Sequence, residues 1–400
     1  MTYTISNNKQ VNQKIQADLD YITGRVATLL GDNLDSILLC GGFGRGEGSV
    51  VVEKDLVHIV NDYDFTIVLN SKNRLHYLKL YKKIHGPLEA LAKELAQELE
   101  IKQVDLSPKP LSYFSEKQKL KIENYEVKMG HVLLYGKNNP VRMMPEWKFE
   151  DIPLFEGTWL FRNRGAGLLI AGLYFINSNK IPKEKQENFV VECTKAKLAM
   201  GDSVLLLNKR YHYLYNKRFN RLKTVDISKV PGGETLKKMY KNGIDQKLSP
   251  DFEHYFKQDL IGSWFKLTKE YSRFFHYYEQ RRLGHEFDTW LEYEKLSKPE
   301  NRIEPKTFIK KIITSDFTRP NFTDAFLKSR NSFTISLVPL VLFSFQKDRF
   351  DIEMMKRAAD LLGLTLTGQN KSDWIMLAKA VLNEIHPGGE AGRVINDKIY

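Results

Sequence analysis

Cysteine is rare in this sequence, and we find neither a pattern typical of a secretory signal nor an apolar run long enough to span a membrane. The two cysteines, Cys40 and Cys193, lie in apolar surroundings without CxxC or Cys/His spacing, which argues against a disulfide framework and against a zinc site. The first residues lack the basic start and apolar run of a secretory signal, so we expect a cytoplasmic location. The longest apolar stretch, Phe333 to Phe345, is too short to span a bilayer, so it predicts a buried helix and no membrane partner.

The composition is that of a folded protein with more than one core. The 400 residues are too many for one ordinary core, and the 42% hydrophobic and 28% charged fractions exclude extensive disorder. The formal net charge of +12 favours anionic partners such as nucleotides or RNA. Many soluble proteins carry such an excess without binding nucleic acid, so the charge alone leaves the partner open.

The residue patterns predict an α+β fold, with a mixed sheet and helices in residues 1–147. A leading helix is predicted from Asn8 to Leu30, where apolar residues recur at helical spacing. Short apolar or β-branched runs predict strands at Ser36–Cys40, Tyr63–Leu69 and Ile101–Leu106. Between the last two strands, Pro87 predicts a break between one helix that ends at Ile84 and another that ends near Glu100.

Residues 148–400 carry long helical patterns and predict an all-helical domain, which can comprise two subdomains. The clearest of these patterns are Trp159–Asn177, Asn188–Leu207, Phe252–Arg282 and Ile352–Leu362. The lysine-rich segments 178–187 and 221–248 are predicted to be loops.

A glycine cluster follows the first predicted strand, in the string GGFGRGEG from Gly41 to Gly48. Gly41 and Gly42 allow the backbone to turn sharply and to approach a ligand closely, and a helix that starts there would favour phosphate. Arg45 is a candidate to bind the same phosphate. Taken by itself, the cluster fits a tight turn without a ligand better than a phosphate site.

Two aspartates at the start of the second predicted strand favour a ligand-binding role for the glycine cluster. Asp62 and Asp64 are two residues apart, so they project from one face while Tyr63 and Phe65 project from the other. Adjacent carboxylates repel, and a divalent cation such as Mg²⁺ or Mn²⁺ would relieve the repulsion. The alternative is that Asp62 caps a turn and Asp64 faces solvent.

A third carboxylate, Asp105, lies between apolar neighbours in the third predicted strand. Three carboxylates could hold two metal ions roughly 4 Å apart against a nucleoside triphosphate. Asp105 could instead be a turn aspartate before Ser107 and Pro108.

The glycine turn followed by Asp-x-Asp and a later aspartate resembles the DNA polymerase β nucleotidyltransferase superfamily, and GGFGRGE is similar to the turn of PII uridylyltransferases. The resemblance covers about residues 34 to 136 and implies an insertion at 50–60. It implies that Gly41 and Gly42 approach the triphosphate, that Asp62 and Asp64 bind metal, and that Asp105 assists the acceptor.

Two basic segments of the helical half are further candidates. The sequence around Lys195 and Lys197 looks like superfamily helices in which a lysine reaches the triphosphate; the two side chains point to different faces, so at most one would serve. Basic and aromatic residues alternate from Lys209 to Lys223, including Arg218 and Arg221, which suits single-stranded nucleic acid. Solvated lysines and an amphipathic helix with core aromatics explain the same patterns.

These expectations combine into a metal-dependent nucleotidyltransferase that transfers a nucleoside monophosphate to an acceptor hydroxyl and releases pyrophosphate. The motif does not specify the nucleotide or the acceptor, which could be RNA, a protein, a small molecule or another nucleotide. The alternative is a catalytically silent module that senses nucleotide or binds RNA.

Overall fold

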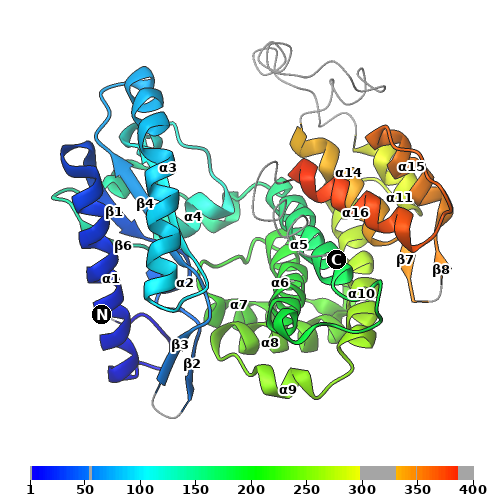
Figure 1. The fold of residues 1–400 in the computed structure, drawn as a ribbon. Helices are drawn as coiled ribbons and strands as arrows, with labels where there is room; N and C mark the ends of the chain where they lie inside the picture. The colour runs from blue at the N-terminus through cyan, green and yellow to red at the C-terminus, as the bar shows by residue number, and fades with distance from the viewer. Residues whose placement is uncertain (1, 54–55, 298–329, 348, 386–400) are drawn as a thin grey trace. The chain divides into compact units, whose positions relative to one another are not determined.

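The computed structural model describes residues 2–53, 56–297, 330–347 and 349–385, and it divides into two compact units (Figure 1). The chain returns to the first unit twice after leaving it. The first unit comprises Met1–Pro153, Asn208–Val225 and Lys241–Asp251, and the second comprises Leu154–Leu207, Asp226–Tyr240 and Phe252–Tyr400. The α+β class is confirmed, because a mixed sheet with helices precedes a helical second half. The predicted helical domain includes 298–329 and 386–400, which lie outside the described residues.

A four-stranded sheet is the centre of the first unit, in the order β5-β4-β1-β6. Its strands are β1 (Leu34–Leu39), β4 (Tyr63–Leu69), β5 (Val104–Pro110) and β6 (Val132–Tyr135). β1 pairs antiparallel with β4 and β6, and β4 pairs parallel with β5. The predicted strand Tyr63–Leu69 is confirmed at both ends.

Two long helices, α1 (Lys9–Leu30) and α3 (Arg74–Glu98), cover one face of this sheet (Figure 1). Alternate strand residues point into the core beneath them, including Ile37, Leu39, Tyr63, Phe65 and Ile67. The opposite face carries a smaller core around Leu38, Cys40, Val68 and Phe114. The helix α4 (Ile122–Met129) precedes β6. The period of two along β4 therefore leaves Asp64 on the smaller-core face, opposite Tyr63 and Phe65.

Several predicted boundaries were wrong. In the second half, the helix predicted at Asn188–Leu207 begins at Lys183, inside the loop predicted at 178–187, and the helix predicted at Phe252–Arg282 is divided into Phe252–Phe256 and Leu260–Leu283. Two differences affect the first half. α3 runs through Pro87 without a break, because its buried stripe continues on both sides of the proline, from Leu80 and Ile84 to Leu88. β5 begins at Val104 and contains two prolines; as an edge strand it tolerates their missing N–H groups.

The segment expected to be an insertion forms a hairpin of its own. β2 (Val50–Glu53) and β3 (Leu56–Ile59) pair antiparallel as a separate two-stranded sheet between the glycine turn and β4. Residues 54–55 at its tip lie outside the described residues.

The second unit is helical apart from one short hairpin, β7 (Phe345–Gln346) with β8 (Arg349–Phe350). Its helices are α5 (Phe155–Leu173), α6 (Lys183–Leu207), α9 (Phe252–Phe256), α10 (Leu260–Leu283), α11 (Trp290–Leu296), α14 (Arg330–Leu342), α15 (Ile352–Leu362) and α16 (Lys371–Ile385). Two more helices follow α6, namely α7 (Tyr215–Leu222) in the first unit and α8 (Gly233–Leu248), within which the division between the units falls. α8 replaces part of the loop predicted at 221–248. No helix in the described part of the chain has the length and apolar character needed to cross a membrane.

Short 3₁₀ turns connect these elements. They are η1 (Gly31–Asn33), η2 (Leu111–Phe114), η3 (Pro140–Met143), η4 (Phe149–Asp151) and η5 (Ile227–Lys229).

Candidate active site

The pairing of β4 with β5 brings two of the predicted carboxylates together. Asp64 and Asp105 are partners in the parallel register, so their side chains leave the same face of the sheet. Asp62 precedes β4 by one residue and is partly buried, as Asp64 is, whereas Asp105 is exposed. The three aspartates that were predicted separately thus lie at one end of two neighbouring strands.

The glycine turn meets the same end of β4. Gly41 opens the short helix α2 (Gly41–Gly44) with a φ of +60°, and a Cβ built on it would lie only 1.8 Å from Oδ2 of Asp64. The amide of Cys40 donates to the carbonyl oxygen of Asp64 at 2.8 Å, which fixes the turn to the strand. A residue without a side chain is therefore required at 41 for the carboxylate to occupy its position.

The carboxylates disfavour each other's ionisation. Burial raises the pKa of Asp64 to about 6, and the negative charges of Asp62 and Asp105 add to the increase. The pKa of Asp105 is raised as well, first by partial loss of contact with water and then by the charge of Asp62. A cation at this position would lower both pKa values by opposing the accumulated negative charge.

Besides Lys109 of β5 itself, which lowers the pKa of Asp105, two charged residues of other elements outside the predicted set act on these carboxylates. Lys247, near the end of α8, lowers the pKa of Asp64, and Glu123, in the first turn of α4, raises that of Asp105. The Ser49 hydroxyl donates to the carbonyl of Lys247, which attaches this part of α8 to the first unit. Neither residue belongs to a local motif, so only the folded chain reveals its proximity.

The donor atoms suit a hard cation, although the carboxylates do not form a closed cage. Among the described residues, no group of three or more acidic, histidine or cysteine side chains is arranged to hold a metal ion. Mg²⁺ commonly binds through one or two carboxylates together with substrate phosphates and water. Asp62 and Asp64 supply oxygen donors of that kind.

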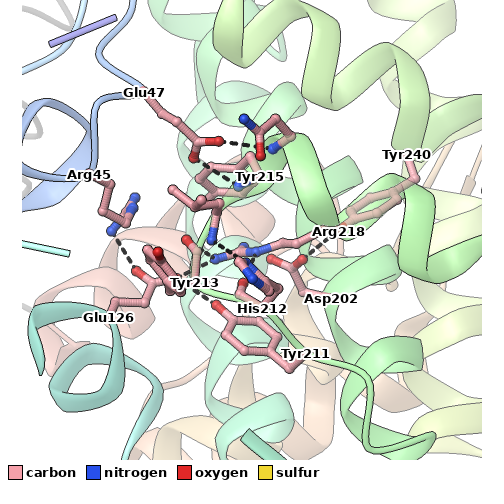
Figure 2. A network of polar contacts seen from close by, with 12 residues as sticks. Arg45, Glu47, Glu126, Asp202, Tyr211, His212, Tyr213, Tyr215, Arg218 and Tyr240 are labelled. Atoms are coloured by element: carbon pink, nitrogen blue, oxygen red, sulfur yellow. Dashed lines mark hydrogen bonds and ion pairs between the residues drawn. The ribbon is translucent and has the colours of Figure 1, made fainter. Parts of the chain in front are cut away.

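Arg45 leaves the glycine turn in another direction and is held in a buried ion-pair network (Figure 2). Its Nη1 lies 2.8 Å from Oε2 of Glu126 on α4, and Arg218 of α7 pairs with the other carboxylate oxygen. The hydroxyl of Tyr211 donates to Glu126 at 2.6 Å. Burial alone would raise the pKa of Glu126, but the two arginines and Tyr211 lower it, so the carboxylate stays ionised. The guanidinium of Arg45 is thus already paired with Glu126. Its role in binding phosphate stays a prediction.

Glu47 fixes the other end of the glycine turn. It is 1% exposed, and its carboxylate accepts the amides of Tyr215 and Asn216 at 2.8 and 2.9 Å (Figure 2). These amides lie in the first turn of α7, where a negative charge is favourable. The turn that approaches Asp64 is therefore braced by α7.

The basic and aromatic segment 209–223 is partly structural, and its role in binding nucleic acid stays a prediction. Arg218 is 1% exposed, with its guanidinium over the rings of Tyr211 and Tyr215. Arg221 donates to the carbonyl of Tyr211 at 2.6 Å. The basic residues of this segment that remain exposed are Lys209, Arg210, Lys217 and Lys223.

The two lysines of α6 lie in the second unit and differ in their surroundings. Lys195 is 2.8 Å from Glu192 and partly exposed. Lys197 lies over the ring of Tyr255 at 5.1 Å, and burial lowers its pKa. A role for either in triphosphate binding stays a prediction.

Comparison of the chain with protein-family models, with curated proteins and with solved structures gives no match. What the fold and the site define is a class: an α+β protein with an acidic site where a glycine turn meets two parallel strands.

Proposed function

We propose that this chain is a metal-dependent nucleotidyltransferase, which transfers a nucleoside monophosphate from a triphosphate to an acceptor hydroxyl. One observation carries the proposal: Asp62, Asp64 and Asp105 gather at one strand end, against a glycine whose missing side chain makes room for Asp64. Such a cluster costs stability unless a cation binds there, so its presence favours a role in binding one.

A divalent cation fits the chemistry of these residues. When bound, Mg²⁺ or Mn²⁺ would neutralise charge on the triphosphate and favour ionisation of the acceptor hydroxyl. Asp62 and Asp64 would supply the oxygen ligands. Asp105 would assist the acceptor by accepting the proton that its hydroxyl loses.

The remaining residues position the nucleotide. Gly41 and Gly42 let the backbone approach the phosphates closely, because neither has a side chain at the turn. Lys247 places positive charge beside Asp64, and the bracing by Glu47 and Glu126 keeps the turn fixed. Catalysis of this kind relies on positioning and charge rather than on a covalent intermediate.

The acceptor is open at the level of chemical class. RNA, a protein side chain, a small molecule and a second nucleotide would all use the same site. The exposed basic residues of the segment 209–223 would favour an anionic acceptor over a cationic one.

Transfer of label provides the test. The full chain is incubated with each of the four α-labelled ribonucleoside triphosphates and Mg²⁺ or Mn²⁺, with and without bulk RNA. The expected result is pyrophosphate release together with label on an acceptor, for at least one triphosphate, and loss of both in Asp64→Asn.

Two other outcomes separate the alternatives. Metal-dependent triphosphate binding without any label transfer, in every acceptor condition, would identify a sensing module instead. If Asp64→Asn transfers label as fast as the unaltered chain, the site is not where the chemistry occurs.

A further inference from the structure

We propose that the second unit contains a separate binding site for a small aromatic molecule that carries a negative charge. The site is a cavity of about 650 Å³ between one face of α10 and the connection from α14 to β7. Its volume lies within the range of small-molecule sites. All of its lining residues belong to the second unit, so this proposal does not depend on the proposed transferase activity.

One wall of the cavity is apolar and aromatic. Phe343 and Phe265 are partly exposed in the lining, and Phe345 and Leu342 are buried behind them. The rings of Phe265 and Phe345 meet edge to face, with centroids 5.1 Å apart and an interplanar angle of 72°. Rings in this arrangement present both edges and faces, which suits a flat aromatic guest better than a flexible chain.

Three lysines surround this apolar wall. Lys266 and Lys269 are three residues apart on α10, so they lie on neighbouring turns of one helix face, and Lys347 comes from the opposite wall. All three are exposed, and none has an ion-pair partner in the part of the chain that the structure describes.

The nearest acidic residue on the same helix does not neutralise them. Glu270 is 8% exposed and pairs with Arg273 at 3.1 Å, so its charge is already compensated. Lining hydroxyls are engaged too, since Thr268 donates to the carbonyl of Phe265 and Ser272 accepts from Trp290. The cavity therefore combines an apolar floor with uncompensated positive charge, and a ring bearing a carboxylate, sulfonate or phosphate satisfies both.

A matched pair of dyes tests each half of this description on the full chain. Anilinonaphthalene sulfonate carries the ring system and the charge, whereas phenylnaphthylamine carries the same rings without the charge. Trp264 and Trp290 lie beside the lining, because their rings are 5.0 Å from the rings of Phe265 and Phe343, respectively, so tryptophan fluorescence reports on occupancy. We expect saturable binding of the sulfonate at one molecule per chain, with energy transfer from tryptophan.

Charge removal should weaken only the sulfonate. In Lys266→Gln/Lys269→Gln we expect the dissociation constant of the sulfonate to rise roughly five- to tenfold, since two exposed and therefore individually weak ion pairs are lost. Affinity for phenylnaphthylamine should stay within about twofold. The control Lys257→Gln/Lys356→Gln removes two exposed lysines of the same unit that do not line the cavity.

The proposal is overturned if the cavity and control variants lose sulfonate affinity equally, or if sulfonate binding does not saturate. It is also overturned if the uncharged dye binds as tightly as the sulfonate to the unaltered chain. Both variants replace exposed side chains, so thermal unfolding of each should match that of the unaltered protein.

Discussion

The carboxylate of Asp64 occupies the place where residue 41 would carry a side chain. Its Oδ2 lies 1.8 Å from the position that a Cβ on Gly41 would take, and Gly41 has a φ of +60°. Two requirements for glycine therefore coincide at one residue, one from backbone conformation and one from space. They can be separated by experiment, because another glycine of the same unit carries only the first.

Gly41→Ala should abolish transfer, while Gly31→Ala should not. Both glycines have positive φ, so each alanine should cost on the order of 1 to 3 kcal/mol of stability, but nothing lies within 4 Å of a Cβ at Gly31. Only the change at 41 displaces Asp64. Metal-dependent triphosphate binding and turnover check this, and equal activity in the two variants would contradict the placement of the site.

Asp64→Asn should inactivate the protein and stabilise it above pH 6. The pKa of Asp64 is about 6 in the folded chain against an ordinary value of 3.8, so its ionisation favours the unfolded state. The penalty is absent below about pH 4 and complete above about pH 6, where it reaches up to about 3 kcal/mol. Urea denaturation at pH 4 and pH 8 without metal measures it.

Asp32→Asn is the matched control, because Asp32 is exposed in η1. Asp62→Asn should also lose transfer and remain folded. Full activity in either Asp62→Asn or Asp64→Asn would remove the assignment of the metal site.

Lys247→Met should move the acid limb of the activity profile to higher pH. Lys247 lowers the pKa of Asp64, so its removal raises that pKa and delays the ionisation that metal binding requires. Mg²⁺ affinity should fall as pH decreases through about 6, and at a higher pH in the variant. Titrating metal at several pH values measures both effects. The control Lys238→Met, on the same helix, should leave the pH profile unchanged. If neither variant shifts the profile, Lys247 does not belong to the site.

Glu126→Gln should destabilise the first unit severely. Arg45 and Arg218 have side chains only 7% and 1% exposed, and the change removes the negative charge that both buried guanidinium groups share. Removing one member of such a buried pair costs about 3 to 5 kcal/mol. Glu94→Gln breaks an exposed pair with Arg25 and should cost less than about 1 kcal/mol. Hydrogen exchange in α4 and α7 distinguishes the two, and similar protection in both variants would show that the network is dispensable.

Local sequence patterns predicted the framework of the first unit because its signals are local. The period of two around Asp64 identified β4 and the face of its carboxylates, and the apolar spacing from Val11 to Val26 identified α1. The helix break predicted at Pro87 was wrong, because the local tendency of proline to end a helix is outweighed by a buried stripe that only tertiary packing creates.

The bracing of the site could not be predicted in this way. Arg218 lies in a segment whose composition suits contact with nucleic acid, yet its side chain is buried against Glu126. No local sequence pattern near either residue predicts that they pair. Lys247 likewise reaches Asp64 through a late return of the chain to the first unit. Long-range pairing of charges depends on the complete fold, and a periodic pattern in one sequence carries no information about it.

The bond from Arg218 to Glu126 joins positions 92 residues apart, which orders events during synthesis on the ribosome. The helix α4 leaves the exit tunnel well before its basic partner has been translated. Until then Glu126 has no Arg218 to pair with, and the glycine turn has no α7 against which to rest. A nascent chain that ends between Asp105 and Arg218 thus contains all three aspartates without the finished frame that holds them, and this unit can be completed only after Asp251 has been translated.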